Sequence, residues 1–345
     1  MPDELNRKDS HLSICLETPV EFPAGSGFGH LRFDHDALPE LDRAEIELDT
    51  TLLGVRLSAP VLIGAMTGGT PRSGEINRRL AIAASRAGVG FALGSQRPML
   101  QDPSSTPSFD VRAHAPDLRL LVGNLGAVQL NYGVDADAIN GLITRLGCDA
   151  FNLHLNPLQE VVQPGGDSNF GGLLAKLERA IPALAVPVIV KEVGSGISET
   201  TACKLATLPI AGVETAGVGG TSWSAIESRR TSDVLQRSIG ERFAQWGIPT
   251  AESIAICRRA MPGRIVVASG GLRSGIDAAK ALALGADAVA FALPMLKAAA
   301  RSVEDVEVEI ARMLEELRTV MFLTGCRRVD ELRSRPLRNA VDLTA

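Results

Sequence analysis

The 345-residue sequence lacks the features that mark disulfide-rich, zinc-binding and membrane-spanning proteins. Its five cysteines are scattered and never spaced as C-x-x-C, so neither a disulfide framework nor a structural zinc site is expected. This cysteine usage fits a reducing cytosol, and we expect a cytoplasmic protein. No run of about 18 apolar residues is present and the polar start resembles no signal peptide, so we expect no membrane segment.

An excess of positive charge is also missing, because the formal net charge is −5. A general nucleic-acid-binding protein usually needs a basic face, so we expect no nucleic-acid partner. The remaining balance, with 45% hydrophobic and 22% charged residues, provides ample apolar material for a core.

Eight short apolar segments recur along the chain, and most are followed by a helix-like pattern. They are near-continuously apolar, as expected for parallel strands that are covered on both faces. Such units can form an open doubly wound sheet or a closed barrel. Their number and spacing favour an α/β fold of the (β/α)8 TIM-barrel type. The segments are Ala59–Met66, Val89–Ser95, Leu118–Gly126, Ala150–Pro157, Pro187–Gly194, Ile210–Gly217, Arg264–Gly271 and Ala288–Leu293.

The same pattern predicts the domain boundaries. Residues 1–58 form an N-terminal extension without a core of its own, 59–325 form the barrel, and 326–345 form a C-terminal tail. A longer segment, Val218–Pro262, separates strands six and seven, and we expect a loop and two helices there. Other helices are predicted at Ser73–Ala87, Ala138–Leu146, Leu173–Ala180, Thr200–Leu208, Ile276–Leu284 and Val303–Phe322.

Polar residues gather where the apolar segments end. In a barrel these ends converge on one face, where such enzymes keep their active sites. The sequence therefore predicts one site that is built from several strand ends. These ends are Met66–Thr70, Gly94–Arg97, Gly123–Gly126, His154–Glu160, Lys191–Gly194, Gly219–Trp223 and Ser269–Gly275.

The glycine-rich turn Gly270–Gly275 lies between the seventh strand and a helix. Backbone N–H groups at such a helix start bind anions. Together with Ala292 and Leu293 at the end of strand eight, the turn would form the usual phosphate site of a barrel, and we prefer this reading to a plain turn.

Lys191 lies inside an apolar strand, where an unpaired charge is unfavourable, so it needs a partner. A pair with Glu192 is not expected, because neighbours on a strand point to opposite faces. A Schiff base and a contact with an electron-rich flavin ring both remain open.

A polar cluster follows strand four. His154 and Asn156 share one strand face, and Gln159 and Glu160 come just after them. Glu160 is a hard oxygen ligand that suits Mg²⁺. His154 alone would indicate a core histidine, but the cluster favours a functional role.

A basic group, Arg7, Lys8 and His11, stands near the start of the chain, and Arg97 follows strand two. Terminal charges are usually solvated. A diphosphate ligand would give these residues a purpose, because arginine binds phosphate oxygens through two parallel donors.

At these residues the chain resembles the type 2 isopentenyl-diphosphate isomerases. The resemblance runs from Arg7 to the last helix, and its most specific part is His154–Glu160. The matching stretches are Arg7–Lys8, Met66–Gly69, Gly94–Arg97, His154–Glu160, Val190–Gly194, Gly219–Trp223 and Ala268–Gly271.

The resemblance implies an enzyme that interconverts isopentenyl and dimethylallyl diphosphate with reduced FMN, NADPH as the reductant, and Mg²⁺. It implies a homo-oligomer, a tetramer or an octamer. The diphosphate would contact Arg7, Lys8, Ser95, Gln96 and Arg97. Gln159 would lie at the alkene, and Glu160 would hold the metal. The implied flavin contacts are Ala65, Met66, Thr67, Ser95, Asn124, Lys191, Thr221, Gly271, Arg273, Ala292 and Leu293. Relatives often have a serine where this chain has Ala216.

The reaction protonates one carbon and deprotonates another nearby, and no pair of carboxylates presents itself for both tasks. The resemblance assigns this acid–base chemistry to N5 of the reduced flavin. Catalytic roles then fall to His154, Asn156, Gln159 and Lys191. Lys191 would face the N1–O2 edge of the ring, and Gln159 would orient the alkene or relay a proton.

Three alternatives compete with this interpretation. A flavin-dependent 2-hydroxy-acid oxidase usually needs a histidine near the end of strand six or seven, but no histidine follows His154. A Schiff-base aldolase would use Lys191. A ligand-binding or scaffold protein without activity is disfavoured by the convergence of so many polar strand ends.

Overall fold

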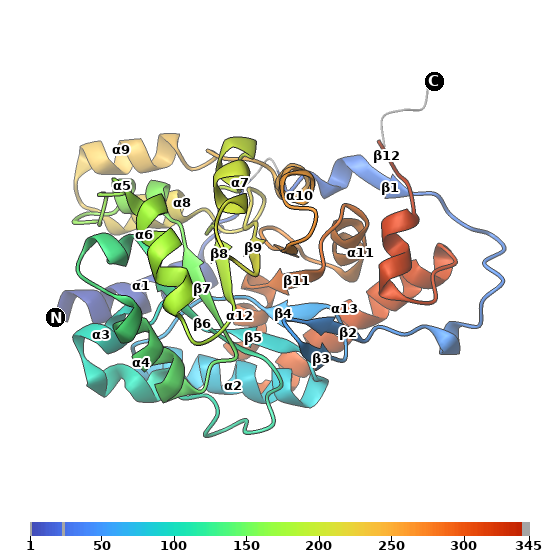
Figure 1. Ribbon diagram of the computed structural model, residues 1–345, viewed down its shortest axis with the longest axis horizontal. Helices are drawn as coiled ribbons and strands as arrows, with labels where there is room; N and C mark the ends of the chain where they lie inside the picture. Colours follow the sequence, from blue (N-terminus) through green and yellow to red (C-terminus); the bar gives the residue numbers. More distant parts are fainter. Residues whose placement is uncertain (1, 23–24, 340–345) are drawn as a thin grey trace.

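The computed structural model describes residues 2–22 and 25–339. Eight parallel strands close into a barrel in the order β10-β11-β4-β5-β6-β7-β8-β9 (Figure 1). This closure confirms the predicted (β/α)8 fold and excludes the alternative of an open sheet. The strands are β4 (Val61–Ile63), β5 (Gly90–Ala92), β6 (Leu121–Gly126), β7 (Ala150–His154), β8 (Val188–Lys191), β9 (Gly212–Glu214), β10 (Ile265–Ala268) and β11 (Ala288–Phe291).

Each predicted apolar segment contains one barrel strand, but the strands are mostly shorter. Small and apolar residues continue past the strand ends into the loops, so the composition alone overstates strand length. Helices α2 (Pro71–Ala87), α4 (Ala136–Leu146), α6 (Leu173–Ala180), α7 (Glu199–Ala206), α11 (Gly275–Ala283) and α13 (Val303–Leu323) confirm the predicted helices. Shorter helices are α3 (Arg97–Gln101), α5 (Pro157–Val162) and α12 (Leu293–Ala299).

Local signals set the ends of α2. The Thr70 side chain accepts a hydrogen bond from the Ser73 amide, and the Ser73 hydroxyl accepts one from the Thr70 amide, which forms a capping box. Pro71 occupies the first turn, and Gly88 ends the helix with a left-handed φ of 67°. This helix therefore begins directly after the end of the first barrel strand and its site loop.

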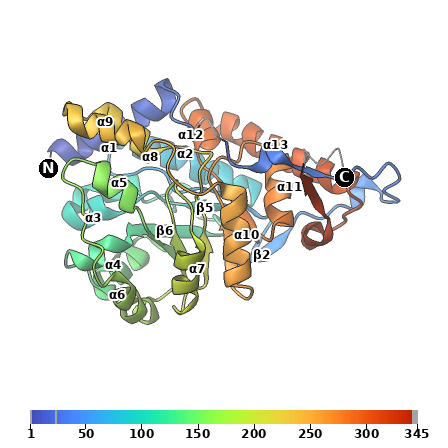
Figure 2. The ribbon, with the colours of Figure 1, turned by 90° about the horizontal axis from the view of Figure 1, so that it is seen from above.

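The segment between β9 and β10 differs from the prediction. It holds three helices, α8 (Trp223–Arg230), α9 (Val234–Arg242) and α10 (Thr250–Ala260), and the prediction of two was wrong. Helix α10 packs on α7 as an ordinary barrel helix, whereas α8 contacts α1, α5 and α9 (Figure 2). The buried face of α8 includes Ser224, Glu227 and Ser228, so it lacks the apolar period by which helices are predicted.

Two hydrophobic cores hold the barrel. One lies between strands and helices and contains most of the large apolar side chains. The other fills the barrel interior with small and medium side chains such as Ala92, Val122, Ala150 and Ile189. The hairpin of β2 (Thr50–Leu52) and β3 (Val55–Leu57) adds Leu52 and Leu57 to this interior core.

The N-terminal extension packs on the barrel rather than on itself. Helix α1 (Pro2–Glu17) contacts α2, α8 and α12, and its Leu12 joins the outer core. Strand β1 (Leu31–Phe33) pairs antiparallel with β12 (Leu337–Asn339), which joins the segment after α1 to the C-terminal end of the described chain (Figure 1). Within the described residues, the structure has no helix of the length and apolarity that crossing a membrane requires.

Candidate active site

Strand register places three polar residues side by side at one end of the barrel. His154 of β7 is the register partner of Lys191 of β8, and Lys191 is the partner of Glu214 of β9. Register partners in neighbouring strands point to the same face. Because Ile189 of the same strand belongs to the interior core, Lys191 also points into the barrel.

Two adjoining cavities open at these strand ends. The first has an empty volume of about 950 Å³, including its open mouth, and the second about 810 Å³. Both fall in the range of small-molecule sites, about 300–1,000 Å³. The cavities meet at a shared wall, formed by Lys8, His11, Ala65, Met66, Lys191, Val193 and Trp223.

The predicted flavin contacts divide between the two cavities. Ser95 and Asn124 line the second cavity. The other nine line the first cavity: Ala65, Met66, Thr67, Lys191, Thr221, Gly271, Arg273, Ala292 and Leu293. Residues from five different strand ends and from their following loops thus surround the first cavity, as the convergence argument predicts.

Most predicted substrate and catalytic residues line the second cavity. They are Arg7, Lys8, Ser95, Arg97, His154, Asn156, Gln159, Glu160 and Lys191. Arg7 and Lys8 belong to α1, so the N-terminal extension reaches the cavity of its own chain. Arg97 forms an ion pair with Asp167 at 2.7 Å, and Gln129 also donates to the Asp167 carboxylate at 2.8 Å. The Asp167 carboxylate is therefore the partner of Arg97 in this structure, whereas the sequence predicts a substrate phosphate as its partner.

Gln96 takes part in the fold through its side chain. Its side chain is fully buried, and its Oε1 accepts a hydrogen bond from the Asn124 amide at 2.9 Å. The side chain therefore supports the end of β6 and lines neither cavity, and a diphosphate contact by Gln96 stays a prediction.

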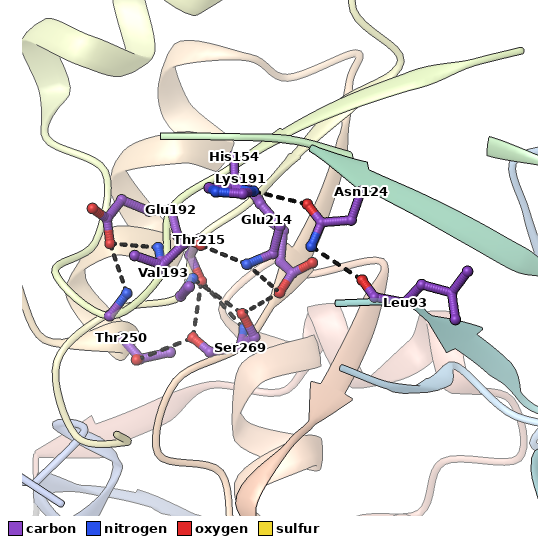
Figure 3. A network of polar contacts seen from close by, with 12 residues as sticks. Leu93, Asn124, His154, Lys191, Glu192, Val193, Glu214, Thr215, Thr250 and Ser269 are labelled. Carbon is purple, nitrogen blue, oxygen red and sulfur yellow. Dashed lines mark hydrogen bonds and ion pairs between the residues drawn. The ribbon is translucent and has the colours of Figure 1, made fainter. Parts of the chain in front are cut away.

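Lys191 is held by two acceptors in a buried position (Figure 3). Its Nζ donates to the Glu192 carbonyl oxygen at 2.6 Å and lies 3.4 Å from Oε1 of Glu214. The Glu192 carboxylate turns away, as predicted, and accepts bonds from the amides of Val193, Gly194 and Ser195. Burial raises the pKa of Glu192, and these backbone bonds oppose that shift.

His154 is a neutral hydrogen-bonding group. The Asn124 amide nitrogen donates to the Leu93 carbonyl oxygen, so the Asn124 Oδ1 faces His154 Nδ1 at 2.9 Å (Figure 3). The imidazole therefore donates from Nδ1, and its Nε2 carries a lone pair. Burial lowers the pKa of His154 to about 3, and the charges of Lys191 and Lys8 add to the shift.

This shift predicts a stability loss on acidification. The folded-state pKa of His154 is about 3 and its unfolded value is 6.5, so only the unfolded chain takes up a proton as the pH falls from 6.5. Between pH 7 and pH 5 this group should lower the free energy of unfolding by about 2 kcal/mol. Urea titrations of wild type and His154→Gln should show a smaller pH dependence in the variant. The exposed His35→Gln is the matched control, and equal pH dependence in all three would contradict this account.

His11 fixes α1 over the two cavities. Its Nε2 lies 2.9 Å from Oε1 of Glu227, and its ring meets the edge of Trp223 at a centroid distance of 5.1 Å. Burial lowers the pKa of His11 to about 4, although the Glu227 carboxylate opposes that shift. Glu227 also pairs with Arg230 of the same helix at 2.5 Å. Through its contact with His11, the buried Glu227 carboxylate links helices α1 and α8.

Comparison with known proteins places this site in a family. A sequence model of FMN-dependent dehydrogenases matches residues 173–339. The isopentenyl-diphosphate delta-isomerase of Synechococcus sp. is 51% identical over 319 residues, which are 92% of this chain and 91% of the relative. The chain belongs to the isopentenyl-diphosphate delta-isomerase family. The isomerases of Rickettsia bellii and Nostoc sp. are 46% and 45% identical, over 97% and 95% of this chain and 98% and 94% of theirs.

Solved structures support the same fold for this member of the isomerase family. Mandelate oxidase with (S)-2-phenylpropionate matches with a TM-score of 0.67 at 20% identity, over 98% of each chain. Mandelate oxidase with 3,3-difluoro-2-hydroxy-3-phenylpropionic acid matches with a TM-score of 0.66 at 19% identity, over 98% of this chain and 99% of that one. At this identity the likeness shows a shared barrel and nothing about the reaction.

Two backbone turns pack closely against each other at the floor of the first cavity. Two Gly-Gly turns face each other there, because a Cβ on Gly220 would lie 2.6 Å from the Gly271 nitrogen. Gly270 has a φ of 97°, and a Cβ there would lie 2.2 Å from the Gly217 oxygen. At the helix start, however, the amides of Arg273 and Gly275 already donate to Asp277 and Glu316. Any phosphate would therefore use the remaining amides of the predicted turn.

Gly270→Ala should destabilise the protein by about 2 kcal/mol or more, because it combines a strained left-handed φ with a backbone clash. Urea unfolding followed by circular dichroism measures this loss. The matched control is Gly263→Ala, where an added Cβ meets nothing within 4 Å. Equal stability of the two variants would refute the account of this turn.

The donor set around Glu160 suits a Mg²⁺ ion that also binds substrate. Glu160 Oε1 accepts from Asn156 Nδ2 at 2.8 Å, and its Oε2 accepts from the Asp167 amide at 2.7 Å. The Asn156 Oδ1 atom is buried without a hydrogen-bond partner and could accept from a metal-bound water. Among the described residues no group of three or more metal-binding side chains occurs. Mg²⁺ commonly binds one carboxylate together with waters and substrate phosphates.

Ala216 takes an unusual conformation, with a positive φ of 36°, and lines the first cavity. Its amide donates to the Ser269 hydroxyl at 3.1 Å. The Ser269 hydroxyl, which itself donates to Glu214, therefore holds the backbone at this position.

Sequence reasoning overlooked two carboxylates of the site. Glu214 interrupts an apolar strand in the same way as Lys191 does, and that interruption was a usable signal. Asp167 lies in a loop after α5, where no pattern singles out one acidic residue, so only the structure could reveal its contact with Arg97.

Proposed function

We propose that this chain interconverts isopentenyl and dimethylallyl diphosphate, with reduced FMN in the first cavity and the substrate in the second. The observation that carries the proposal is the junction of the two cavities at Lys191. On one side of Lys191 lies a glycine-rich floor, and on the other side lie the cationic side chains of Arg7, Lys8 and Arg97. Membership of the isomerase family and the FMN-dependent family match support the same assignment.

The first cavity would hold the flavin ring beside Lys191. When bound, reduced FMN supplies an N5 position for acid–base chemistry and an electron-rich ring beside the alkene. Lys191 would place its ammonium at the N1–O2 edge, while Ser95 and Asn124 would contact the ring from the second cavity. The glycines at 220 and 271 let two turns pack backbone to backbone at the floor of this cavity.

The second cavity would bind the substrate by its diphosphate. Arg7, Lys8 and Arg97 would neutralise the phosphate oxygens, and the substrate would replace Asp167 as the partner of Arg97. Glu160 would hold Mg²⁺ against the same oxygens. Gln159, one residue earlier on α5, would then face the alkene and orient it.

His154 and Asn156 would act as positioning groups in this scheme. With its pKa lowered to about 3, His154 is neutral at pH 7, so it would contribute a fixed dipole instead of an imidazolium acid. Asn156 orients Gln159 and Glu160, since its side-chain amide donates to Gln159 at 3.2 Å and to Glu160 at 2.8 Å.

The decisive test is an anaerobic assay of the purified protein with isopentenyl diphosphate, FMN, NADPH and Mg²⁺. We expect a yellow protein that forms dimethylallyl diphosphate only after its flavin is reduced. The reduced flavin should not be consumed in turnover. Full activity without flavin would refute the mechanism, and no product under any of these conditions would refute the proposed reaction. The roles of NADPH and Mg²⁺ are tested by omitting each in turn. That the enzyme works in the cytoplasm as a tetramer or octamer remains a prediction.

A further inference from the structure

Glu214 is a buried carboxylate with no part in the scheme above. Its residue is 6% exposed, and it lies in a barrel strand whose neighbours are apolar or glycine. Its Oε1 accepts a hydrogen bond from the Ser269 hydroxyl at 2.7 Å and lies 3.4 Å from the Lys191 ammonium (Figure 3). A strand at this position would normally carry an apolar side chain into the barrel, so the carboxylate calls for an explanation.

Stability is a weak explanation. The desolvation of two buried ions can exceed their mutual attraction, so apolar residues of similar size would often hold the barrel as well. The lysine is also already bonded to the Glu192 carbonyl oxygen at 2.6 Å, and this bond is shorter than its contact with Glu214. The pair is therefore better explained by what its charges do in the cavity.

The two charges face different spaces. Lys191 lines both cavities, whereas Glu214 lines the first and not the second. Among the described residues that line the first cavity, Glu214 is the carboxylate and Lys8, Lys191 and Arg273 are the cations. Arg273 is paired with Glu21, so its charge is already balanced at the outer edge. Glu214 thus lies beside the lysine in the wall of the first cavity.

We propose that Glu214 is a positioning residue that holds the Lys191 ammonium at the junction and moderates the positive charge which that lysine offers to a bound flavin ring. This inference rests on the proposed binding of FMN and deepens it. A full positive charge would stabilise the anionic reduced ring strongly. A balanced pair leaves the reduced ring less stabilised and a better base for exchanging protons with an alkene.

The test is the two-electron midpoint potential of bound FMN, measured against a reference dye in wild type and Glu214→Gln. Removing the carboxylate exposes the lysine charge, so we expect the ratio of reduced to oxidised flavin at a fixed potential to rise by about ten- to a hundredfold. This corresponds to an upward shift of roughly 30–60 mV. An unchanged potential in a folded, FMN-binding Glu214→Gln would overturn the inference.

Two further variants separate charge from shape. Glu214→Asp keeps the charge and should retain a potential close to that of wild type. If Glu214→Gln fails to fold, Lys191→Met and the double variant Lys191→Met/Glu214→Gln replace it. The double variant should show a higher midpoint potential than Lys191→Met, with the same ten- to hundredfold rise in the ratio of reduced to oxidised flavin. Equal potentials of these two variants would overturn the inference. A wild type that binds no FMN overturns the proposed function as well, whereas failure of these comparisons alone leaves that function standing.

Discussion

Replacing Lys191 by methionine is expected to lower kcat for isomerisation by about a hundredfold or more. The ammonium is a buried charged donor at the junction of the two cavities, and loss of one preorganised donor at a reacting centre typically costs about 10²–10³ in rate. The measurement is an anaerobic assay with saturating FMN, NADPH, substrate and Mg²⁺, so that weaker cofactor binding is not mistaken for a slower reaction.

The same substitution should also destabilise the protein by about 3–5 kcal/mol, because it leaves the buried Glu214 carboxylate without its cation. Lys191→Met/Glu214→Gln is therefore the matched control. We expect the double variant to recover most of the lost Tm while its activity stays low. If activity returned together with stability, Lys191 would have a structural role only.

The second large effect is expected for Glu160→Gln. Loss of one carboxylate ligand should raise the Mg²⁺ concentration needed for half-maximal activity by about 10–100-fold, since the remaining ligands would be waters and substrate oxygens. Initial rates of EDTA-treated protein across a Mg²⁺ titration measure this shift. Glu160 contacts Asn156 and the Asp167 amide, and an amide side chain can keep part of that network, so the fold should survive.

The control for this experiment is Glu178→Gln, which removes an exposed carboxylate from α6. Its Mg²⁺ dependence should equal that of wild type. The flavin affinity of both variants should stay unchanged, because Glu160 lines the second cavity and not the first. An unaltered Mg²⁺ requirement in Glu160→Gln would remove this residue from the metal site.

The sequence predicted the barrel well because its signals are local. Each apolar segment is short and interrupted by glycine or polar residues, and each strand forms within the predicted range. Helix ends are equally local, as Thr70 and Gly88 show for α2. The prediction failed at α8, whose buried Glu227 bonds with His11 and Arg230, because a helix with a polar buried face carries no apolar period.

The sequence by itself determined which residues stand at the strand ends, and therefore which side chains could share a site. Only the tertiary structure decided which of them meet. The register of β8 against β9 sets Lys191 beside Glu214. The hydrogen bond to the Asn124 backbone keeps the Gln96 side chain out of both cavities, and a distant loop brings Asp167 to Arg97. Periodicity along a chain reports the face on which a residue lies, but contacts between strands depend on how the barrel closes, which no single segment encodes.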